Sequence, residues 1–219
     1  MSAQSGPKKT EGARGPITSW SGWDSRGKAQ SGADPVAAFE KSDPIESRAE
    51  RRYELLAVAA RGFRPPQFLV SMDLGDDGQT ETSLALIPGH SRFKETWSLL
   101  YRQIAETNHP KVTPYAIYLL GVNPPADATN EDLGTFNDFY TNVHLVEVVE
   151  RHHALRAVRY ELIEEVKPPS QGAPKFLAVY EVDETSASNR RHVGPPYSAG
   201  PEVWQGHKTP WRLWYRRLR

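Results

Sequence analysis

The chain has 219 residues, contains no cysteine, and balances 27 basic against 27 acidic residues. The lack of cysteine excludes disulfides and thiolate sites, and zero formal net charge gives no electrostatic footprint for a nucleic acid or an anionic membrane. No run approaches the roughly 18 apolar residues of a membrane span and residues 1–15 have no apolar signal segment, so we expect a soluble, cytoplasmic protein.

The N-terminal part of the chain is predicted to be irregular. Residues 1–33 are rich in Gly, Ser, Lys and Gln, and we expect them to form a flexible tail. The rings of Trp20 and Trp23 either dock onto the body of the protein, which we favour, or contact a partner. Asp34-Pro35 and Asp43-Pro44 then provide helix-start signals.

Two later segments of the first half carry apolar patterns. Residues 68–74 are typical of a strand, and the turn residues Gly75 to Gly78 close it. Residues 97–104 are ambiguous, because their apolar residues also lie at helical spacing.

The second half is more regular. A nearly continuous apolar run at 115–122, ended by Asn123-Pro124-Pro125, predicts a strand, and a helix is expected to begin near Asn130. Further strands are predicted at 155–166, 176–182 and 211–218, with a poorly patterned connection at 184–210. This order is the ferredoxin-like βαββαβ arrangement with a short or degraded second helix.

Three segments of the first half recur, in the same order, about half the chain later. The pairs are residues 52–56 with 159–163, 66–70 with 174–178, and 97–104 with 211–218. One such match would mean little, but three in order indicate a duplication. We therefore expect two related units, at 34–110 and 111–219.

His144 is the ionisable residue of most interest. On a regular helix, Phe136, Tyr140 and Val143 form one apolar face, and His144 lies at its edge. An imidazole there can act as a general acid or base near neutral pH. The alternative is a structural histidine whose nitrogens bond to the backbone or a hydroxyl.

Other polar residues give weaker signals. Glu147 would fall in the centre of the apolar face, so we expect the helix to end or bend soon after His144. Tyr160 projects from the next strand and either orients a ligand or packs. His152-His153 has no third ligand at metal spacing, and His207 lies in a loop without a constellation, so no metal site is predicted.

The second half resembles the EthD-like branch of the dimeric α+β barrel superfamily. The resemblance is carried by the segments 117–127, 136–140, 143–145, 157–160 and 174–182, and by the spacing from His144 to Tyr160. It covers about residues 113–219.

This resemblance implies an α+β fold in which two ferredoxin-like units pack their antiparallel sheets as one barrel, here within a single chain. Members are often homodimers, so a homodimer stays open as an alternative assembly. Relatives include cofactor-free decarboxylases, cyclases, isomerases and monooxygenases of aromatic or polyketide molecules. Haem-using members exist, but the sequence offers no ligand pattern beyond single histidines, so haem stays a minor alternative and we expect no cofactor.

Three departures from the family pattern limit the resemblance. His152-His153 replaces a common Pro-Gly turn, and Asn142 replaces an acidic residue that often precedes the Val-His pair. Nothing in the first half resembles the segment 136–144. We therefore expect the first copy to lack the first strand and the helix, and one site per chain.

The resulting hypothesis is a cofactor-independent lyase or isomerase of secondary metabolism, acting on a small apolar or aromatic molecule. His144 would be the general acid/base, Tyr140 and Tyr160 would orient the substrate, and Phe136 and Tyr118 would form apolar walls. The alternatives are a non-catalytic binding or stress-related barrel protein, and a barrel whose pocket is filled by side chains.

Overall fold

The structure is a computed structural model that describes residues 8–9, 15–25, 34–41, 50–58, 64–75, 93–107, 112–189 and 196–218. Its strands are β1 (Lys8–Lys9), β2 (Ile17–Ser25), β3 (Glu50–Val58), β4 (Phe68–Gly75), β5 (Phe93–Glu106), β6 (Ala116–Asn123), β7 (Arg156–Lys167), β8 (Phe176–Val182) and β9 (Lys208–Arg217). Its helices are α1 (Pro35–Glu40), α2 (Asn130–Phe139), the π-helical turn η2 (Tyr140–His144), α3 (Leu145–His152), α4 (Glu184–Ser188) and α5 (Glu202–Gln205).

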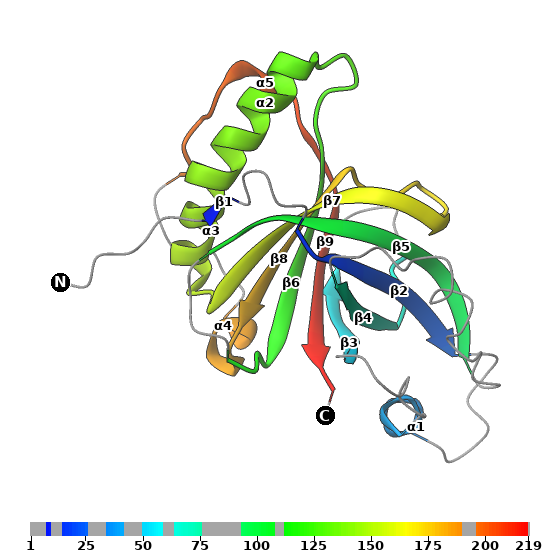
Figure 1. Cartoon of the computed structure of the whole chain (residues 1–219). Coiled ribbons are helices and arrows are strands. Elements are labelled where there is room, and N and C mark those ends of the chain that lie inside the picture. Colours follow the sequence, from blue (N-terminus) through cyan, green and yellow to red (C-terminus); the bar gives the residue numbers. More distant parts are fainter. Residues whose placement is uncertain are drawn as a thin grey trace.

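The strands β2 to β9 form one closed antiparallel barrel (Figure 1). The order around the barrel is β5-β2-β4-β3-β9-β6-β8-β7, and β7 pairs back with β5, while the short β1 also pairs with β5. Closure leaves no open sheet edge in the ring, which removes the exposed backbone donors and acceptors of an edge strand.

Each half of the barrel has the strand order of a ferredoxin-like unit. Numbered within its own half, the order is 4-1-3-2 for β5-β2-β4-β3 and again for β9-β6-β8-β7. The three repeated sequence segments fall on the second, third and fourth strands of both halves. The predicted α+β fold, with two ferredoxin-like units forming an intramolecular barrel, is therefore confirmed.

The expectation of a flexible tail over residues 1–33 is wrong for Ile17–Ser25. These residues form β2, which pairs with β4 on one side and β5 on the other. The first unit thus has its first strand, contrary to our expectation. The composition misleads because small residues are required here: a Cβ added at Gly22 would lie 2.6 Å from both the Pro66 ring and the Trp97 ring.

The barrel interior is filled by large side chains. Trp20, Tyr53, Trp97 and Trp211 are all buried there, and the rings of Trp97 and Trp211 lie 5.4 Å apart. The ambiguous segment 97–104 is part of strand β5, where alternate residues point into this core. The ligand site must therefore be sought outside the barrel.

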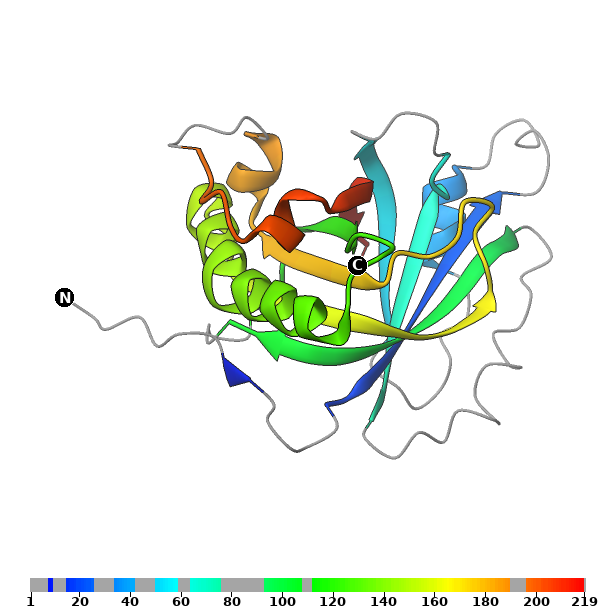
Figure 2. The same cartoon turned by 90° about the horizontal axis from the view of Figure 1, so that it is seen from above.

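Helices cover the outer faces of the two sheets unequally (Figure 2). In the second half, α2, η2 and α3 lie across the sheet as one long rod. In the first half the corresponding helix is the six-residue α1, whose Phe39 stacks on Phe68 at 4.2 Å and meets Phe93 edge-on at 4.9 Å. Aromatic rings thus fill the helix–sheet space of the first half. Among the described residues no helix is long and apolar enough to cross a membrane.

Candidate functional site

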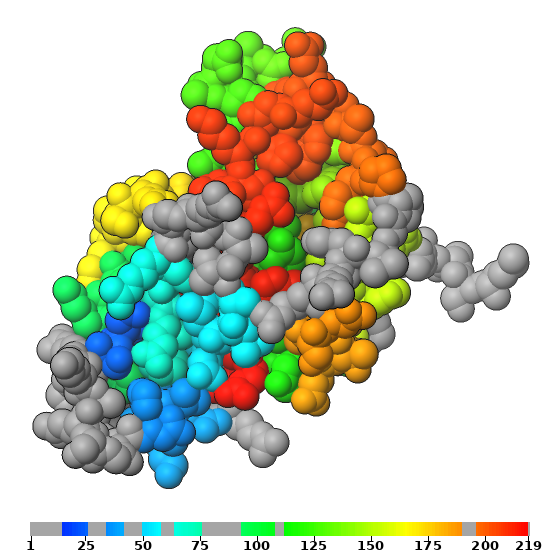
Figure 3. Space-filling view, turned by 180° about the vertical axis from the view of Figure 1, so that it is seen from behind, coloured from blue at the N-terminus to red at the C-terminus, as the bar shows by residue number. Residues whose placement is uncertain are grey.

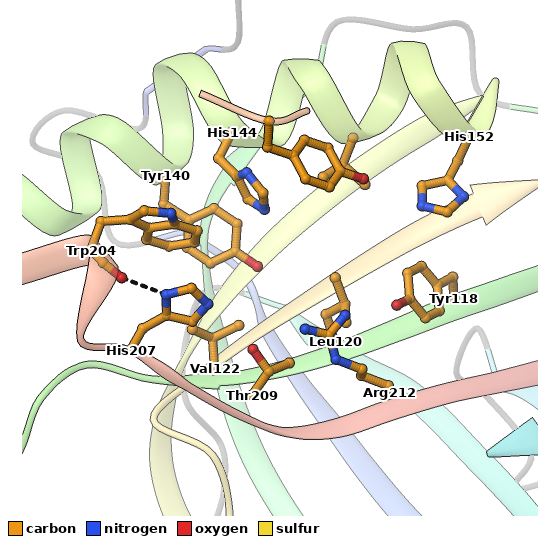
Figure 4. Close-up of a pocket in the computed structure, with 12 residues that line it drawn as sticks. Tyr118, Leu120, Val122, Tyr140, His144, His152, Trp204, His207, Thr209 and Arg212 are labelled. Atoms are coloured by element: carbon orange, nitrogen blue, oxygen red, sulfur yellow. Dashed lines mark hydrogen bonds between the residues drawn. The ribbon is translucent and has the colours of Figure 1, made fainter. Parts of the chain in front are cut away.

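A cavity of about 180 Å³ lies between the sheet of the second half and its helices (Figure 4). Strands β6 and β9 form its floor, η2 and α3 form its roof, and the segment 197–207 closes one side. The residues that line it are Tyr118, Leu120, Val122, Tyr140, His144, Val148, His152, Tyr197, Trp204, His207, Thr209 and Arg212.

The π-helical turn η2 aims His144 into this cavity. The N–H of Leu145 donates to the carbonyl of Tyr140, five residues earlier, which inserts one residue into the helical repeat. The insertion rotates the following helix by about 100°. As a result Val143, expected on the apolar face, is 37% exposed, and the buried residues of α3 are Leu145, Val148, Val149 and His152.

The same insertion explains the position of Glu147. We expected the helix to end or bend after His144 to avoid burying this carboxylate, but the helix continues to His152. Because the π turn rotates Glu147 away from the centre of the face, its carboxylate reaches Ser198 and accepts the backbone N–H of Ser198 over 3.1 Å.

Arg159 holds the π turn from below. Its fully buried guanidinium donates to the hydroxyl of Thr141 over 2.6 Å and to the carbonyl and side-chain oxygens of Asn137 over 3.2 and 2.8 Å. It also lies over the ring of Tyr140, 4.1 Å from the centroid. Burial lowers the pKa of Arg159 to about 10, so it stays charged at neutral pH. Arg159 thereby fixes the backbone from which Tyr140 and His144 project.

His144 is a neutral imidazole at pH 7. Its side chain is 12% exposed, and burial lowers its pKa to about 4, although the nearby carboxylate of Glu147 opposes this shift. Its Nδ1 lies 3.8 Å from Oε2 of Glu147, which is too long for a direct hydrogen bond. The aromatic rings of Trp204 and Tyr197 flank it, with centroids at 4.7 and 4.9 Å.

His207 provides a second imidazole with a fixed tautomer. Its Nδ1 lies within hydrogen-bond distance of the carbonyl oxygen of Trp204, and a carbonyl can only accept, so Nδ1 carries the hydrogen. In the neutral ring Nε2 is then an unprotonated acceptor. Figure 4 shows this nitrogen turned toward the cavity.

Trp204 makes the central packing contacts of the segment 197–207, which closes one side of the cavity. Its buried ring contacts those of Phe139, Tyr140, His144 and His207, with centroid distances between 4.1 and 5.2 Å. Figure 3 shows this orange-to-red segment packed against the green helix, away from the blue and cyan strands of the first half. The contact of Glu147 with Ser198, and that of Arg151 with the Tyr197 ring at 3.5 Å, hold the segment to α3.

The structure brings together three of the five predicted site residues. Tyr118, Tyr140 and His144 line the cavity. Phe136 is fully buried behind it, packed on Phe176 and Trp204. Tyr160 lies on the opposite face of the sheet, inside the barrel, with its ring 6.1 Å from that of Trp20. Neither Phe136 nor Tyr160 is placed to touch a molecule in the cavity.

Several residues that line the cavity, or that hold its lining in place, were missed from the sequence. Arg159 could have been found, because strand alternation places it opposite Tyr160 and hence toward the helix. Arg212 could have been found in the same way between Trp211 and Leu213. His207 and Trp204 gave no signal, since they come from an irregular connection whose path depends on the packed fold. His152, for which the sequence predicted no role, ends α3 and lines the cavity.

The donor set does not indicate a metal or haem site. Among the described residues no group of three or more His, Cys, Asp or Glu side chains could hold a metal ion. The cavity is also smaller than the ~300 Å³ at which pockets for drug-sized ligands begin. A haem macrocycle would not fit it, whereas a molecule built on one ring would.

Comparisons with known proteins support the fold alone. No protein-family model and no curated protein matches the chain. A solved structure that does match is named "Crystal structure of Putative Chlorite dismutase TA0507", with a TM-score of 0.51, 12% sequence identity, and coverage of 94% of this chain and 96% of that chain. At this identity the likeness shows that the chain has a dimeric α+β barrel fold.

Proposed function

We propose that the chain is a cofactor-independent enzyme, a decarboxylase, cyclase or isomerase, acting on a small aromatic or polyketide-like molecule in this cavity. The observation that carries the proposal is the neutral imidazole of His144 turned into an aromatic-walled cavity, with the carboxylate of Glu147 at 3.8 Å from Nδ1. Such a pair can take up a proton and stabilise the resulting imidazolium.

The pKa of His144, about 4, keeps the imidazole unprotonated at neutral pH, so its free nitrogen can accept a proton. In the proposed reaction the imidazole removes a proton from an acidic carbon or hydroxyl of the substrate, leaving the electron pair on the substrate as an enolate or phenolate. The imidazolium lies beside Glu147 and then returns the proton to carbon. An isomerisation or cyclisation then has no net proton change, whereas a decarboxylation releases CO₂ and takes up one further proton from solvent.

Tyr140 is suited to stabilise the negative oxygen of that intermediate. Burial raises its pKa to about 12, so it remains a phenol at neutral pH. Its buried hydroxyl lies beside the phenol of Tyr180, which can share a hydrogen bond with it, and Figure 4 shows it directed toward the cavity. A phenol O–H held there can donate to the developing oxyanion. His207 can accept a hydrogen bond from a substrate hydroxyl through Nε2.

Proton exchange tests this proposal without knowledge of the natural substrate. The full chain would be incubated in D₂O with small aromatic β-dicarbonyl compounds and hydroxylated aromatic acids, and NMR would follow deuterium uptake and loss of CO₂. We expect His144→Gln to slow the reaction by about 10² to 10⁴-fold, the usual contribution of a general base.

Two controls sharpen this experiment. His153→Asn changes an exposed histidine outside the cavity at φ 50°, a conformation that Asn tolerates, and should leave the rate unchanged. His207→Gln tests the second imidazole. Equal rates for the wild type and His144→Gln would overturn the assignment of His144. Saturable binding without exchange or turnover of any probe would favour the non-catalytic binding protein instead.

A further inference from the structure

The lining of the cavity carries positive charge without a matching negative charge. This charge is the guanidinium of Arg212, and the lining includes no aspartate or glutamate. Glu147 lies behind His144 and accepts hydrogen bonds from Ser198. A ligand entering the described cavity therefore meets the guanidinium of Arg212 and no carboxylate.

Strand geometry directs Arg212 into this cavity. Its neighbours Trp211 and Leu213 are buried in the barrel interior, so Arg212 points to the opposite face, toward the helices. It lies opposite Leu120 in the pairing of β9 with β6, and Leu120 also lines the cavity. Figure 4 shows the guanidinium on the cavity floor, facing the roof that carries His144.

Within the described part of the chain, no carboxylate pairs with Arg212. Its polar neighbour is the phenol of Tyr118, whose pKa is raised by burial and lowered in part by Arg212. Arg216, on the same strand, is instead paired with Glu54 over 2.5 Å. The planar fork of Arg212 therefore presents donors to the cavity that match a carboxylate in geometry and charge.

The opposite side of the cavity suits an aromatic ring. Trp204, Tyr140 and Tyr197 surround the imidazole of His144 with centroid distances of 4.7, 5.4 and 4.9 Å. A cavity of about 180 Å³ leaves room for one ring and a small substituent. The acidic group would lie on the floor and the ring against these aromatic side chains.

We propose that the ligand of this cavity is a small aromatic monocarboxylate, whose carboxylate pairs with Arg212 while its ring packs against Trp204 and Tyr140. This inference rests on the proposed function in one respect, since it takes the same cavity as the substrate site. It adds a specificity-determining residue and a charge requirement that the acid/base proposal does not contain.

Binding of isosteric probes tests the charge requirement. Benzoate, neutral benzamide and cationic benzylammonium would be titrated into the full chain, with affinity measured by ligand-observed NMR. We expect benzoate to bind at least roughly tenfold more tightly than benzamide, because charged hydrogen bonds contribute more than neutral ones, and benzylammonium to bind weakest. Arg212→Gln should remove the preference for benzoate and leave benzamide binding unchanged.

Arg216→Gln is the matched control. It removes the same charge from the same strand outside the cavity lining, and should keep the preference for benzoate. Arg212→Lys should keep part of the preference for benzoate, because lysine retains the positive charge but lacks the planar guanidinium that can donate two hydrogen bonds to a carboxylate. Near-UV circular dichroism would show that the variants keep the native packing.

The outcomes separate this inference from the proposed function. Equal binding of benzoate and benzamide by the wild type, or a benzoate preference that survives Arg212→Gln, would overturn the carboxylate site. Neither result would contradict the proposed proton exchange or its dependence on His144. A preference for benzoate that depends on Arg212, in a chain without any exchange activity, would support the carboxylate site and overturn the catalytic proposal.

Discussion

The hydroxyl of Tyr101 donates a hydrogen bond of 2.7 Å to the carbonyl oxygen of Pro174. Its counterpart in the second unit, Tyr215, donates over 3.0 Å to the carbonyl of Pro66. Each bond joins the fourth strand of one unit to a proline two residues before the third strand of the other. The two units thus exchange equivalent contacts across the barrel, as expected of a duplicated fold.

Removing either hydroxyl should weaken the barrel. Tyr101→Phe and Tyr215→Phe each leave a carbonyl without its donor in a buried setting, so we expect each to lower the free energy of unfolding by about 1–2 kcal/mol. Urea denaturation followed by tryptophan fluorescence would measure this. Unchanged midpoints in both variants would show that the two bonds contribute nothing to joining the units.

The close approach at Gly121 gives a steric test of the packing around Pro174, whose carbonyl accepts the Tyr101 hydrogen bond. A Cβ added there would lie 2.6 Å from Cγ of Pro174 and 3.0 Å from Cβ of Trp211. Because these neighbours are rigid, Gly121→Ala should destabilise the fold by about 1–3 kcal/mol. Gly134→Ala is the control.

Gly134 lies on α2 with no atom within 4 Å of an added Cβ. Substitution by alanine there should stabilise the fold by about 0.5–1 kcal/mol, through helix propensity alone. Equal unfolding midpoints for the two alanine variants would contradict the packing at Gly121.

The pKa of His144 predicts how stability depends on pH. The pKa is about 4 in the folded protein and 6.5 ordinarily, so the unfolded chain binds this proton more tightly. Stability from this group is complete above about pH 6.5 and is lost as pH falls through about 4. Between pH 7 and pH 4.5 the wild type should lose ~2 kcal/mol more than His144→Gln.

Urea titrations of the wild type and His144→Gln at the two pH values would check this difference. Parallel slopes in the wild type and His144→Gln would mean that His144 is better solvated than the structure shows.

The sequence predicted those parts of the fold that rest on large residues. Tyr53 and Tyr160, or Trp97 and Trp211, fill equivalent places in the shared interior and therefore left a detectable repeat. Strand β2 was missed because its place between Pro66 and Trp97 admits only a glycine at position 22. Composition alone cannot separate such a strand from a tail.

The site was predicted only where regular periodicity holds. Tyr140 and His144 were correctly placed facing the sheet, but Val143 was not, because an inserted residue in η2 is invisible to a 3.6-residue period. Tyr160 was assigned to the wrong face because the strand register was unknown. His207 reaches the cavity only through the tertiary packing of the irregular segment before the last strand.

The segment that closes the cavity depends on Gly200. This residue has φ +73°, and an added Cβ would lie 2.6 Å from the Trp204 ring and 2.7 Å from the Phe139 ring. Gly200→Ala should therefore displace Trp204 from His144 and open the cavity, in addition to the cost of about 1 kcal/mol for a left-handed alanine.

Gly172→Ala separates the two effects, since Gly172 has φ +75° but no atom within 4 Å of an added Cβ. It should show the backbone cost alone and leave the cavity intact. The ring protons of His144, shifted in the NMR spectrum by Trp204 at 4.7 Å, report the displacement directly. Because the ring of Trp204 also forms the aromatic wall, Gly200→Ala should weaken benzoate binding while Gly172→Ala leaves it unchanged. Unshifted His144 resonances in Gly200→Ala would show that the segment 197–207 accommodates the added methyl group without moving Trp204. Another contact would then close the cavity.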